Sequence, residues 1–407
     1  MSDRIVIVGT GQGGYQVAAS LRELHFSGRI VLIGEEPCIP YQRPPLSKGY
    51  MLGELEEARL PLRAAKFFED KHIELAIGRR AVAIDRAHRK VGLDDDAVLD
   101  YDHLVLAVGA RHRRLPVPGA DLQGVYYLRT LAEAQALRAA LRAVKKAVVI
   151  GAGFIGLEIA ASAAKLGVEV TVLEVADRPM ARAISPEMAA IFAREHAKHG
   201  TRLLFNTQAM RLLGQDGHAR GVETVTGEVI DGELIVVGIG VIANVELAAT
   251  CDLEVGNGIV VNELLATADP RVSAIGDCAL HPNAFAAQPL RIESVQNASD
   301  QGRCVAARLT GSPAPYNAVP WFWSDQGSLK LQIAGLAVGV EHSVVRGDAG
   351  GTACSVFSFR AGRLIAVESL NRPGEHMVAR RLIGKHVAIT PEQAADESFD
   401  LRHLTAS

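Results

Sequence analysis

The sequence lacks the features that would anchor a protein in a membrane or bind it to a polyanion. Its 407 residues contain no run of the ~18 to 20 apolar residues that a membrane-spanning helix requires. The formal net charge is −3, so no overall positive charge attracts nucleic acid or an anionic membrane. The first residues lead directly into an apolar strand pattern, without the regions of a secretory signal. We therefore expect a cytoplasmic protein that binds neither nucleic acid nor membranes.

Cysteine is scarce, and the few cysteines are not paired. No two of them stand in a C-x-x-C or C-x4-C arrangement, which predicts free thiols in a reducing compartment and no redox couple. His196 and His199 stand three residues apart, but no further ligand accompanies them, so we expect no metal site. The five cysteines are Cys38, Cys251, Cys278, Cys304 and Cys354.

Glycine, in contrast, is arranged in a pattern with a clear meaning. The segment "RIVIVGTGQGGYQVAAS" predicts a buried strand, a glycine-rich turn and a helix, which is the context that the G-x-G-x-x-G pattern requires. Gly9 makes the tight turn, Gly11 lets a pyrophosphate approach the backbone, and Gly14 lets the helix pack closely on the strand. Glu35 follows the next strand, 26 positions after Gly9, where an acid can bind an adenosine ribose. These features predict a dinucleotide site.

The same unit occurs a second time. "AVVIGAGFIGLEIA" begins at Ala147 and ends in a predicted helix, and the following strand leads to Glu174, 23 positions after Gly151. A carboxylate there accepts hydrogen bonds from both ribose hydroxyls and repels a 2′-phosphate, which favours NAD over NADP. Arg178 and Arg182 lie close enough in the sequence to weaken that preference. Each such unit binds one dinucleotide, so the chain is expected to bind two.

Three further strand patterns end in glycine. "TADPRVSAIGDC" contains Gly276 and Asp277, "YDHLVLAVGA" contains Gly109, and "GELIVVGIGV" contains Gly240. Each alone could be an ordinary strand that ends in a turn. In this order, however, the five elements resemble the glutathione-reductase-type flavoproteins.

Over essentially its whole length the chain is similar to the FAD-dependent ferredoxin reductases that serve bacterial cytochromes P450 and ring-hydroxylating dioxygenases. The segments that carry this resemblance are "YQRPPLSKGYMLG", "GAGFIGLE", "ESVQNASDQG" and "PWFWSDQGSLKLQIAG". It implies an α/β fold with two dinucleotide-binding Rossmann-like domains and a C-terminal α+β domain. The implied limits are 1–112 and 241–317 for the FAD-binding domain, 113–240 for the NAD-binding domain and 318–407 for the C-terminal domain.

The resemblance also implies roles for individual residues. Lys48 is expected beside the flavin ring, paired with Glu158, and these are the two candidate catalytic residues. Glu293, Trp321 and Trp323 are expected near the nicotinamide or the electron exit. The residues expected to bind FAD are Gly9, Gly11, Gly13, Gly14, Glu35, Arg43, Lys48, Val82, Ala107, Gly109, Arg129, Gly276, Asp277 and Val295. The residues expected to bind NAD are Gly151, Gly153, Ile155, Gly156, Glu174, Arg182 and Gly240.

The implied activity is hydride transfer from NADH to FAD, followed by single-electron transfer to a [2Fe–2S] ferredoxin. A basic patch is expected to dock the acidic ferredoxin, with Arg303 as the candidate and Lys330 as a further choice, on a monomer or weak dimer. Two alternatives stay open. One is an NADH oxidase or peroxidase, and the other is a flavoprotein that uses nucleotide binding as a redox switch, as relatives of apoptosis-inducing factor do.

The expected basic patch predicts a salt effect. Because ions screen the attraction between exposed charges, ferredoxin reduction should fall as salt rises from about 0.05 M to about 0.3 M. NADH-dependent reduction of ferricyanide, which needs no docking patch, is the control and should change much less. Steady-state rates at both salt concentrations test this, and equal rates of ferredoxin reduction would rule out the patch.

Overall fold

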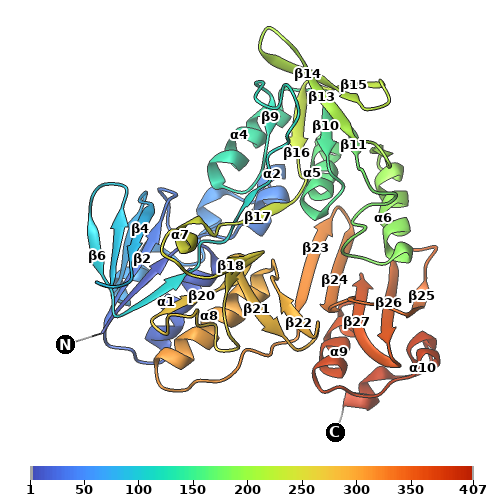
Figure 1. Ribbon diagram of the computed structural model, residues 1–407. Helices are drawn as coiled ribbons and strands as arrows, with labels where there is room; N and C mark the ends of the chain where they lie inside the picture. Colours follow the sequence, from blue (N-terminus) through green and yellow to red (C-terminus); the bar gives the residue numbers. More distant parts are fainter. Residues whose placement is uncertain (1–2, 406–407) are drawn as a thin grey trace. The chain divides into compact units, whose positions relative to one another are not determined.

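The first glycine-rich turn lies at the carboxyl end of the middle strand of a parallel sheet. The fold comes from a computed structural model that describes residues 3–405 (Figure 1). Helix α1 (Gln12–Glu23) follows the turn and packs against α8 (Val295–Leu309). The strands of this sheet, in spatial order, are β20 (Val272–Ala274), β7 (His103–Leu106), β1 (Arg4–Val8), β2 (Arg29–Gly34) and β3 (Ile73–Ile77).

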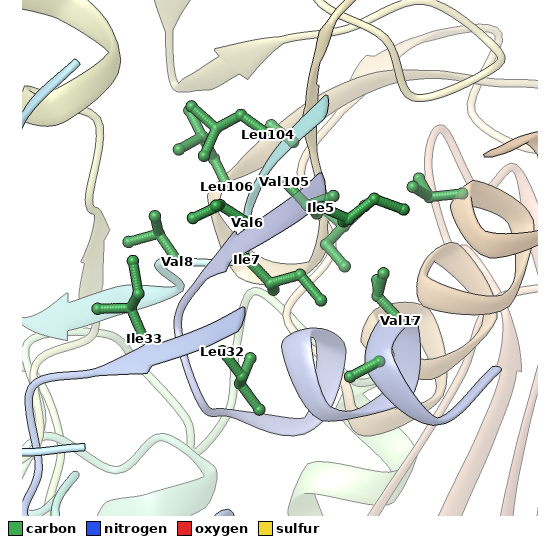
Figure 2. Packing of buried hydrophobic residues seen from close by; sticks show 14 of the residues in the cluster. Ile5, Val6, Ile7, Val8, Val17, Leu32, Ile33, Leu104, Val105 and Leu106 are labelled. Atoms are coloured by element: carbon green, nitrogen blue, oxygen red, sulfur yellow. The ribbon is translucent and has the colours of Figure 1, made fainter. Parts of the chain in front are cut away.

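The inner strands β7, β1 and β2 are buried on both faces, because nearly all consecutive residues along each of them are buried. Figure 2 shows Ile7 pointing toward the helix that carries Val17, whereas Val6 and Val8 point to the opposite face. Ile7 and Val17 are both fully buried, and burying a side chain of this size contributes about 1.5 to 3 kcal/mol. The prediction that this continuous apolar run forms a strand buried on both faces is thereby confirmed.

Short elements complete the part of the chain around this sheet. One antiparallel sheet consists of β4 (Ala81–Asp85), β5 (Lys90–Leu93) and β6 (Val98–Asp100). Another consists of β18 (Val255–Gly256), β19 (Gly258–Val260), β21 (Ala279–Asn283) and β22 (Gln288–Leu290). A two-stranded sheet pairs β8 (Ala110–His112) with β17 (Val241–Ala243). The short helices are η2 (Glu57–Arg59), α3 (Ala65–Asp70), α7 (Glu246–Ala249) and η3 (Gly276–Cys278).

The second glycine-rich turn follows the middle strand of a second parallel sheet. Its strands, in spatial order, are β12 (Arg202–Leu204), β11 (Glu169–Leu173), β10 (Lys146–Ile150), β16 (Leu234–Val237) and β9 (Val125–Tyr126). A three-stranded antiparallel sheet accompanies it, made of β13 (Ala209–Gln215), β14 (His218–Thr224) and β15 (Val229–Asp231). The helices of this part are η1 (Pro44–Ser47), α2 (Gly49–Leu52), α4 (Leu131–Leu141), α5 (Phe154–Lys165) and α6 (Pro186–Lys198).

An antiparallel sheet with helices forms the C-terminal part of the chain. Helix α9 (Pro373–Gly384) lies against β24 (Leu329–Gly335) and β27 (Arg363–Leu370). It is followed by α10 (Pro391–Ala395) and η4 (Leu401–Thr405). The strands, in spatial order, are β23 (Trp321–Gln326), β24 (Leu329–Gly335), β27 (Arg363–Leu370), β26 (Ala353–Arg360) and β25 (His342–Asp348). The predicted fold class, two Rossmann-like domains plus an α+β domain, is therefore confirmed.

The chain divides into two compact units. One contains Ala58–Arg111 and Ile242–Pro320 together with the chain up to Gln42. The other contains Arg43–Glu57 and His112–Val241 together with the chain from Trp321 on. The segment that carries Lys48 thus belongs to the second unit, where it packs against α4 and α5. The domain limits derived from the sequence stay a prediction.

A buried carboxyl group joins the C-terminal sheet to α6 within the second unit. Glu368 on β27 accepts hydrogen bonds from the backbone N–H of Ser185 at 2.8 Å and from its hydroxyl at 2.6 Å. Ser185 is the N-cap of α6, where a negative charge is favourable. Burial nevertheless raises the pKa of Glu368 to about 7, although the hydrogen bonds from Ser185 lower it.

This raised pKa predicts a pH-dependent stability. The folded protein holds the Glu368 proton more tightly than the unfolded chain, so stability falls as pH rises from about 4.5 to about 7. The full effect is about 3 kcal/mol, and Glu368→Gln should remove it because an amide does not ionise. The thermal midpoint of this variant should exceed that of the wild type by more at pH about 8 than at pH about 5. Glu56→Gln, on an exposed side chain, is the control, and an equal difference at both pH values would contradict the assignment.

Candidate active site

The first glycine-rich turn needs glycine for two different reasons. A Cβ on Gly9, whose φ is +115°, would lie 2.1 Å from the carbonyl oxygen of Ala107. A Cβ on Gly14 would lie 1.9 Å from the carbonyl oxygen of Gly9, so both positions are needed for close packing. A Cβ on Gly11 would meet no atom within 4 Å, and Gly11 is the N-cap of α1, where it offers no side-chain cap. The first N–H groups of α1 are therefore available to a phosphate.

Other expected FAD residues follow the strands of the same parallel sheet. Glu35 comes directly after β2 and is exposed, and Ala107 comes directly after β7. Gly276, with φ of +73°, and Asp277 follow β20 after a single residue. The carboxyl ends of parallel strands meet at one edge of a sheet, so these positions share the edge at which nucleotides bind. They fit an adenine dinucleotide.

The remaining positions expected to bind FAD are more scattered. Gly13 is buried on α1, Val295 begins α8, and Gly109, with φ of +64°, follows β7. Val82 differs from these, because it lies on β4 of the separate antiparallel sheet and its side chain is 46% exposed. Arg43 belongs to the second unit, where its guanidinium donates to the carbonyl oxygen of Arg129.

A side chain that the sequence did not single out, Gln301, supports the Gly276 turn. The side-chain oxygen of Gln301 accepts a hydrogen bond from the N–H of Gly276 at 2.6 Å, and its nitrogen lies 3.3 Å from Nδ1 of His281. Gln301 and His281 are both buried, and burial lowers the pKa of His281 to about 4. No local pattern predicts this contact, because a glutamine inside a helix has no fixed partner.

The second glycine-rich turn repeats the geometry of the first. Gly151 has φ of +105°, and its Cβ would lie 2.5 Å from the carbonyl oxygen of Gly238. A Cβ on Gly156 would lie 2.1 Å from the carbonyl oxygen of Gly151, whereas one on Gly153 would meet its nearest atom only at 3.9 Å. Gly153 is the N-cap of α5 and leaves the first N–H groups uncapped, as Gly11 does in α1.

Glu174 is held in place by the backbone around this second turn. Its two carboxylate oxygens accept hydrogen bonds from the N–H of Ala152 at 2.7 Å and from the N–H of Ala176 at 2.9 Å. The carboxylate is thereby fixed next to the glycine-rich loop. Arg182 is exposed, and Arg178 donates to the carbonyl oxygen of Ala181 at 3.1 Å.

The last two positions expected to bind NAD have accessible surfaces. Ile155 is 45% exposed in the first turn of α5. Gly240 is exposed, has φ of +100°, and has open space around its Cβ position. The residues of the second turn thus fit a second dinucleotide.

Lys48 and Glu158, the two candidate catalytic residues, form an ion pair in the second unit. The Lys48 ammonium lies 2.6 Å from Oε2 of Glu158, and their side chains are 20% and 2% exposed. Ser47 donates to the same oxygen at 2.5 Å, and Ser324 donates to Oε1 at 2.7 Å. Three donors therefore satisfy a buried carboxylate, which a protein interior tolerates only in such an arrangement. The sequence did not indicate either serine.

Aromatic and charged groups surround the start of β23. The rings of Trp321 and Trp323 are 5.6 Å apart, and the Arg380 guanidinium lies 4.9 Å from the Trp321 ring centre. His376 is buried and packs in a T-shaped arrangement against Trp321, and burial lowers its pKa to about 4. Trp321 and Trp323 are only partly buried, so this cluster borders the surface of the second unit.

The expected docking residues are exposed. The Arg303 side chain is 57% exposed and forms an ion pair with Asp300 at 2.5 Å. Lys330 is exposed on β24. Glu293 is exposed as well, and it accepts a hydrogen bond from Arg291 at 2.5 Å.

Four of the five cysteines are poorly suited to redox chemistry. No disulfide joins any of the five, all of which lie within the described residues, and burial raises the pKa of Cys251, Cys304 and Cys354. Burial also raises the pKa of Cys278 to about 11. A thiol reacts as its thiolate, so these raised values oppose thiol-based electron transfer.

The described part of the chain carries neither a candidate membrane helix nor a candidate metal cluster. Among residues 3–405, no helix is both long and apolar enough to cross a membrane. Over the same residues, no group of three or more His, Cys, Asp or Glu side chains could hold a metal ion.

The family model described as pyridine nucleotide-disulphide oxidoreductase matches residues 3–302. The chain belongs to this family. The model described as reductase C-terminal matches residues 321–405. The expected similarity to ferredoxin reductases is confirmed by relatives that span nearly the whole chain.

One relative is rhodocoxin reductase of Rhodococcus erythropolis, which is 51% identical over 98% of this chain and 93% of its own length. The crystal structure of the ferredoxin reductase for the CYP199A2 system from Rhodopseudomonas palustris superimposes with a TM-score of 0.97. It is 48% identical and covers 99% of this chain and 100% of its own. Putidaredoxin reductase, solved in a covalent complex with putidaredoxin, gives a TM-score of 0.97 at 38% identity, over 99% of this chain and 98% of its own.

Because Gly11 and Gly14 have different roles, one added methyl group should affect FAD binding at Gly11 and the stability of the fold at Gly14. Gly11→Ala should leave the thermal midpoint of the apoprotein unchanged but weaken FAD binding about 10-fold or more, because its Cβ would occupy space needed by the pyrophosphate. Gly14→Ala should destabilise the fold by more than about 4 kcal/mol, because its Cβ meets the backbone of Gly9. Calorimetry of the apoproteins and FAD titration separate the two effects. Unchanged FAD affinity of Gly11→Ala would contradict the assignment.

Proposed function

We propose that this chain is an FAD-dependent, NADH-using reductase of a [2Fe–2S] ferredoxin that supplies a cytochrome P450 or a dioxygenase. The oxidoreductase class, the FAD and nicotinamide cofactors and the ferredoxin-reductase type follow from the family and from its near full-length relatives. The observation that carries the proposal is the presence of two glycine-rich turns, each with open space at the glycine that a pyrophosphate would contact. When bound, FAD accepts a hydride from the nicotinamide and passes electrons on singly.

Glu174 supports NADH as the preferred nucleotide. Its carboxylate, fixed by the N–H groups of Ala152 and Ala176, would accept hydrogen bonds from both ribose hydroxyls. The same fixed negative charge would repel a 2′-phosphate, and a side chain held by two hydrogen bonds cannot turn away without losing them. Arg182 is exposed and positively charged, so it would attract a 2′-phosphate. The preference for NADH over NADPH therefore requires that repulsion by Glu174 be stronger than this attraction.

Lys48 is proposed to act beside the flavin ring. The ammonium is held by the buried carboxylate of Glu158, and 20% of the Lys48 side chain remains accessible. Lys48 would then keep a positive charge where the ring gains negative charge on reduction, which raises the reduction potential of the ring. Glu158 is buried, so its role is to position Lys48.

A ferredoxin is the proposed electron acceptor, as the relatives suggest. Arg303, exposed on α8, is the proposed docking residue, and Lys330 is a further candidate. The ion pair of Arg303 with Asp300 is exposed, so it is weak enough to be exchanged for a pair with a partner's carboxylate. A monomer or weak dimer and a cytoplasmic location stay predictions from the sequence.

One coupled assay tests this function against its alternatives. NADH should support rapid reduction of cytochrome c only when a purified bacterial [2Fe–2S] ferredoxin is added, with a rate increase of about 10-fold or more. NADPH should serve about 100-fold less well in kcat/KM, because of Glu174.

The alternatives predict other results in the same assay. An oxidase or peroxidase would consume NADH rapidly in air or with hydrogen peroxide and would need no ferredoxin. A redox-switch protein would be reduced slowly by NADH under all conditions. Either result would reject the proposal.

A further inference from the structure

A chain of buried hydrogen bonds extends from Glu158 into the C-terminal sheet. Ser324 on β23 donates to Oε1 of Glu158 at 2.7 Å. The amide nitrogen of Gln326, two residues along the same strand, donates to the Ser324 hydroxyl at 3.2 Å. The amide oxygen of Gln326 lies 2.8 Å from Nε2 of His196 on α6. All four side chains are buried, and Ser324 is 0% exposed.

The donor and the acceptor of each of these hydrogen bonds can be assigned in only one way. A carboxylate only accepts, so Ser324 must donate to Glu158 and must itself accept from the amide nitrogen of Gln326. The amide oxygen then faces His196, which must carry its proton on Nε2. Burial lowers the pKa of His196, which keeps the ring neutral with a single N–H. In each of these hydrogen bonds the donor therefore lies on the side away from Glu158 and its hydrogen points toward Glu158.

The two oxygens of Glu158 are satisfied from different parts of the sequence. Lys48 and Ser47 both contact Oε2, whereas Ser324 donates to Oε1. Ser162, on the same helix as Glu158, donates to the carbonyl oxygen of Ser47 at 2.8 Å and so fixes the backbone next to Lys48. If Ser324 did not donate, the carboxylate would have to rotate to bring Oε1 to another donor. Lys48 would then move with it.

We propose that Ser324 and Gln326 are positioning residues that set the location of the Lys48 ammonium through Glu158. The inference rests on the proposed role of Lys48 beside the flavin. It assigns a further role to the C-terminal domain, since two of its side chains control the charge next to the cofactor.

The first test is Ser324→Ala in the FAD-loaded enzyme. The limiting rate of flavin reduction by NADH in stopped-flow should fall about 3- to 10-fold, while the apparent Kd for NADH stays within about twofold. The midpoint potential of the flavin should become more negative, because the cation is no longer held in place. The potential is measured without turnover, so it reports the charge next to the ring and not the binding of NADH.

Ser355→Ala is the matched control. Ser355 is a buried serine of the same sheet, and its hydroxyl donates to Ser369 at 3.1 Å. Its removal also deletes one buried hydrogen bond, but this bond has no connection with Glu158. The reduction rate and the potential should equal those of the wild type. If Ser355→Ala lowered both as much as Ser324→Ala, a general loosening of the sheet would explain the effect and the proposal would fall.

A double-mutant cycle with Lys48→Ala shows whether Ser324 acts through Lys48. Lys48→Ala alone should slow flavin reduction and lower the potential, and adding Ser324→Ala should cause no further change. If Lys48→Ala changes neither quantity, the proposed role of Lys48 is wrong. If Lys48→Ala has its effect but Ser324→Ala has none, or if both effects add, only the positioning inference is overturned.

Gln326→Met keeps the test valid if Ser324→Ala does not fold. Methionine has a similar volume but offers Ser324 no N–H donor, so it should change the rate and the potential in the same direction by a smaller factor. Flavin content and thermal midpoint identify the folded variants. A folded Gln326→Met enzyme with the wild-type potential would contradict the proposed hydrogen-bond chain.

Discussion

The structure of the second unit depends on one buried negative charge. Glu158 stands on α5, the helix that follows the second glycine-rich turn, and its carboxylate has to be satisfied away from water. An unpaired charge at such a depth would cost several kcal/mol, so the fold must bring donors to it. They come from the segment that carries Ser47 and Lys48 and from Ser324 on β23. A requirement of electrostatics thereby fixes three segments that are far apart in the sequence.

The sequence revealed those features that depend on neighbouring residues. Gly9 and Gly14 could be predicted because strand, turn and helix follow one another, and the packing of a helix start on a strand tolerates no Cβ at these positions. Glu174 could be predicted because, in a dinucleotide-binding unit, an acid at the end of the next strand binds the ribose. The apolar runs of β1 and β10 predicted buried parallel strands for the same local reason.

Contacts between distant segments could not be predicted in this way. Ser324 and Glu158 are 166 positions apart, and serine has no pattern that distinguishes a hydroxyl bound to a carboxylate from one facing solvent. Gln301, which holds the Gly276 turn, is hidden for the same reason. The pair of Lys48 and Glu158 was expected only through the resemblance to known reductases, because their spacing carries no signal of its own.

The hydrogen bond of Ser324 also limits how this chain can be recombined with its relatives. Residues 321–405 match a family model of their own, which suggests a module that could be exchanged. One residue of that module, however, donates a hydrogen bond to a buried carboxylate that belongs to the oxidoreductase part, residues 3–302. A hybrid joined at a well-chosen boundary would still need a hydroxyl group at this position of the first C-terminal strand. Compatibility between the modules is therefore decided inside the protein, away from the point where the two sequences are joined.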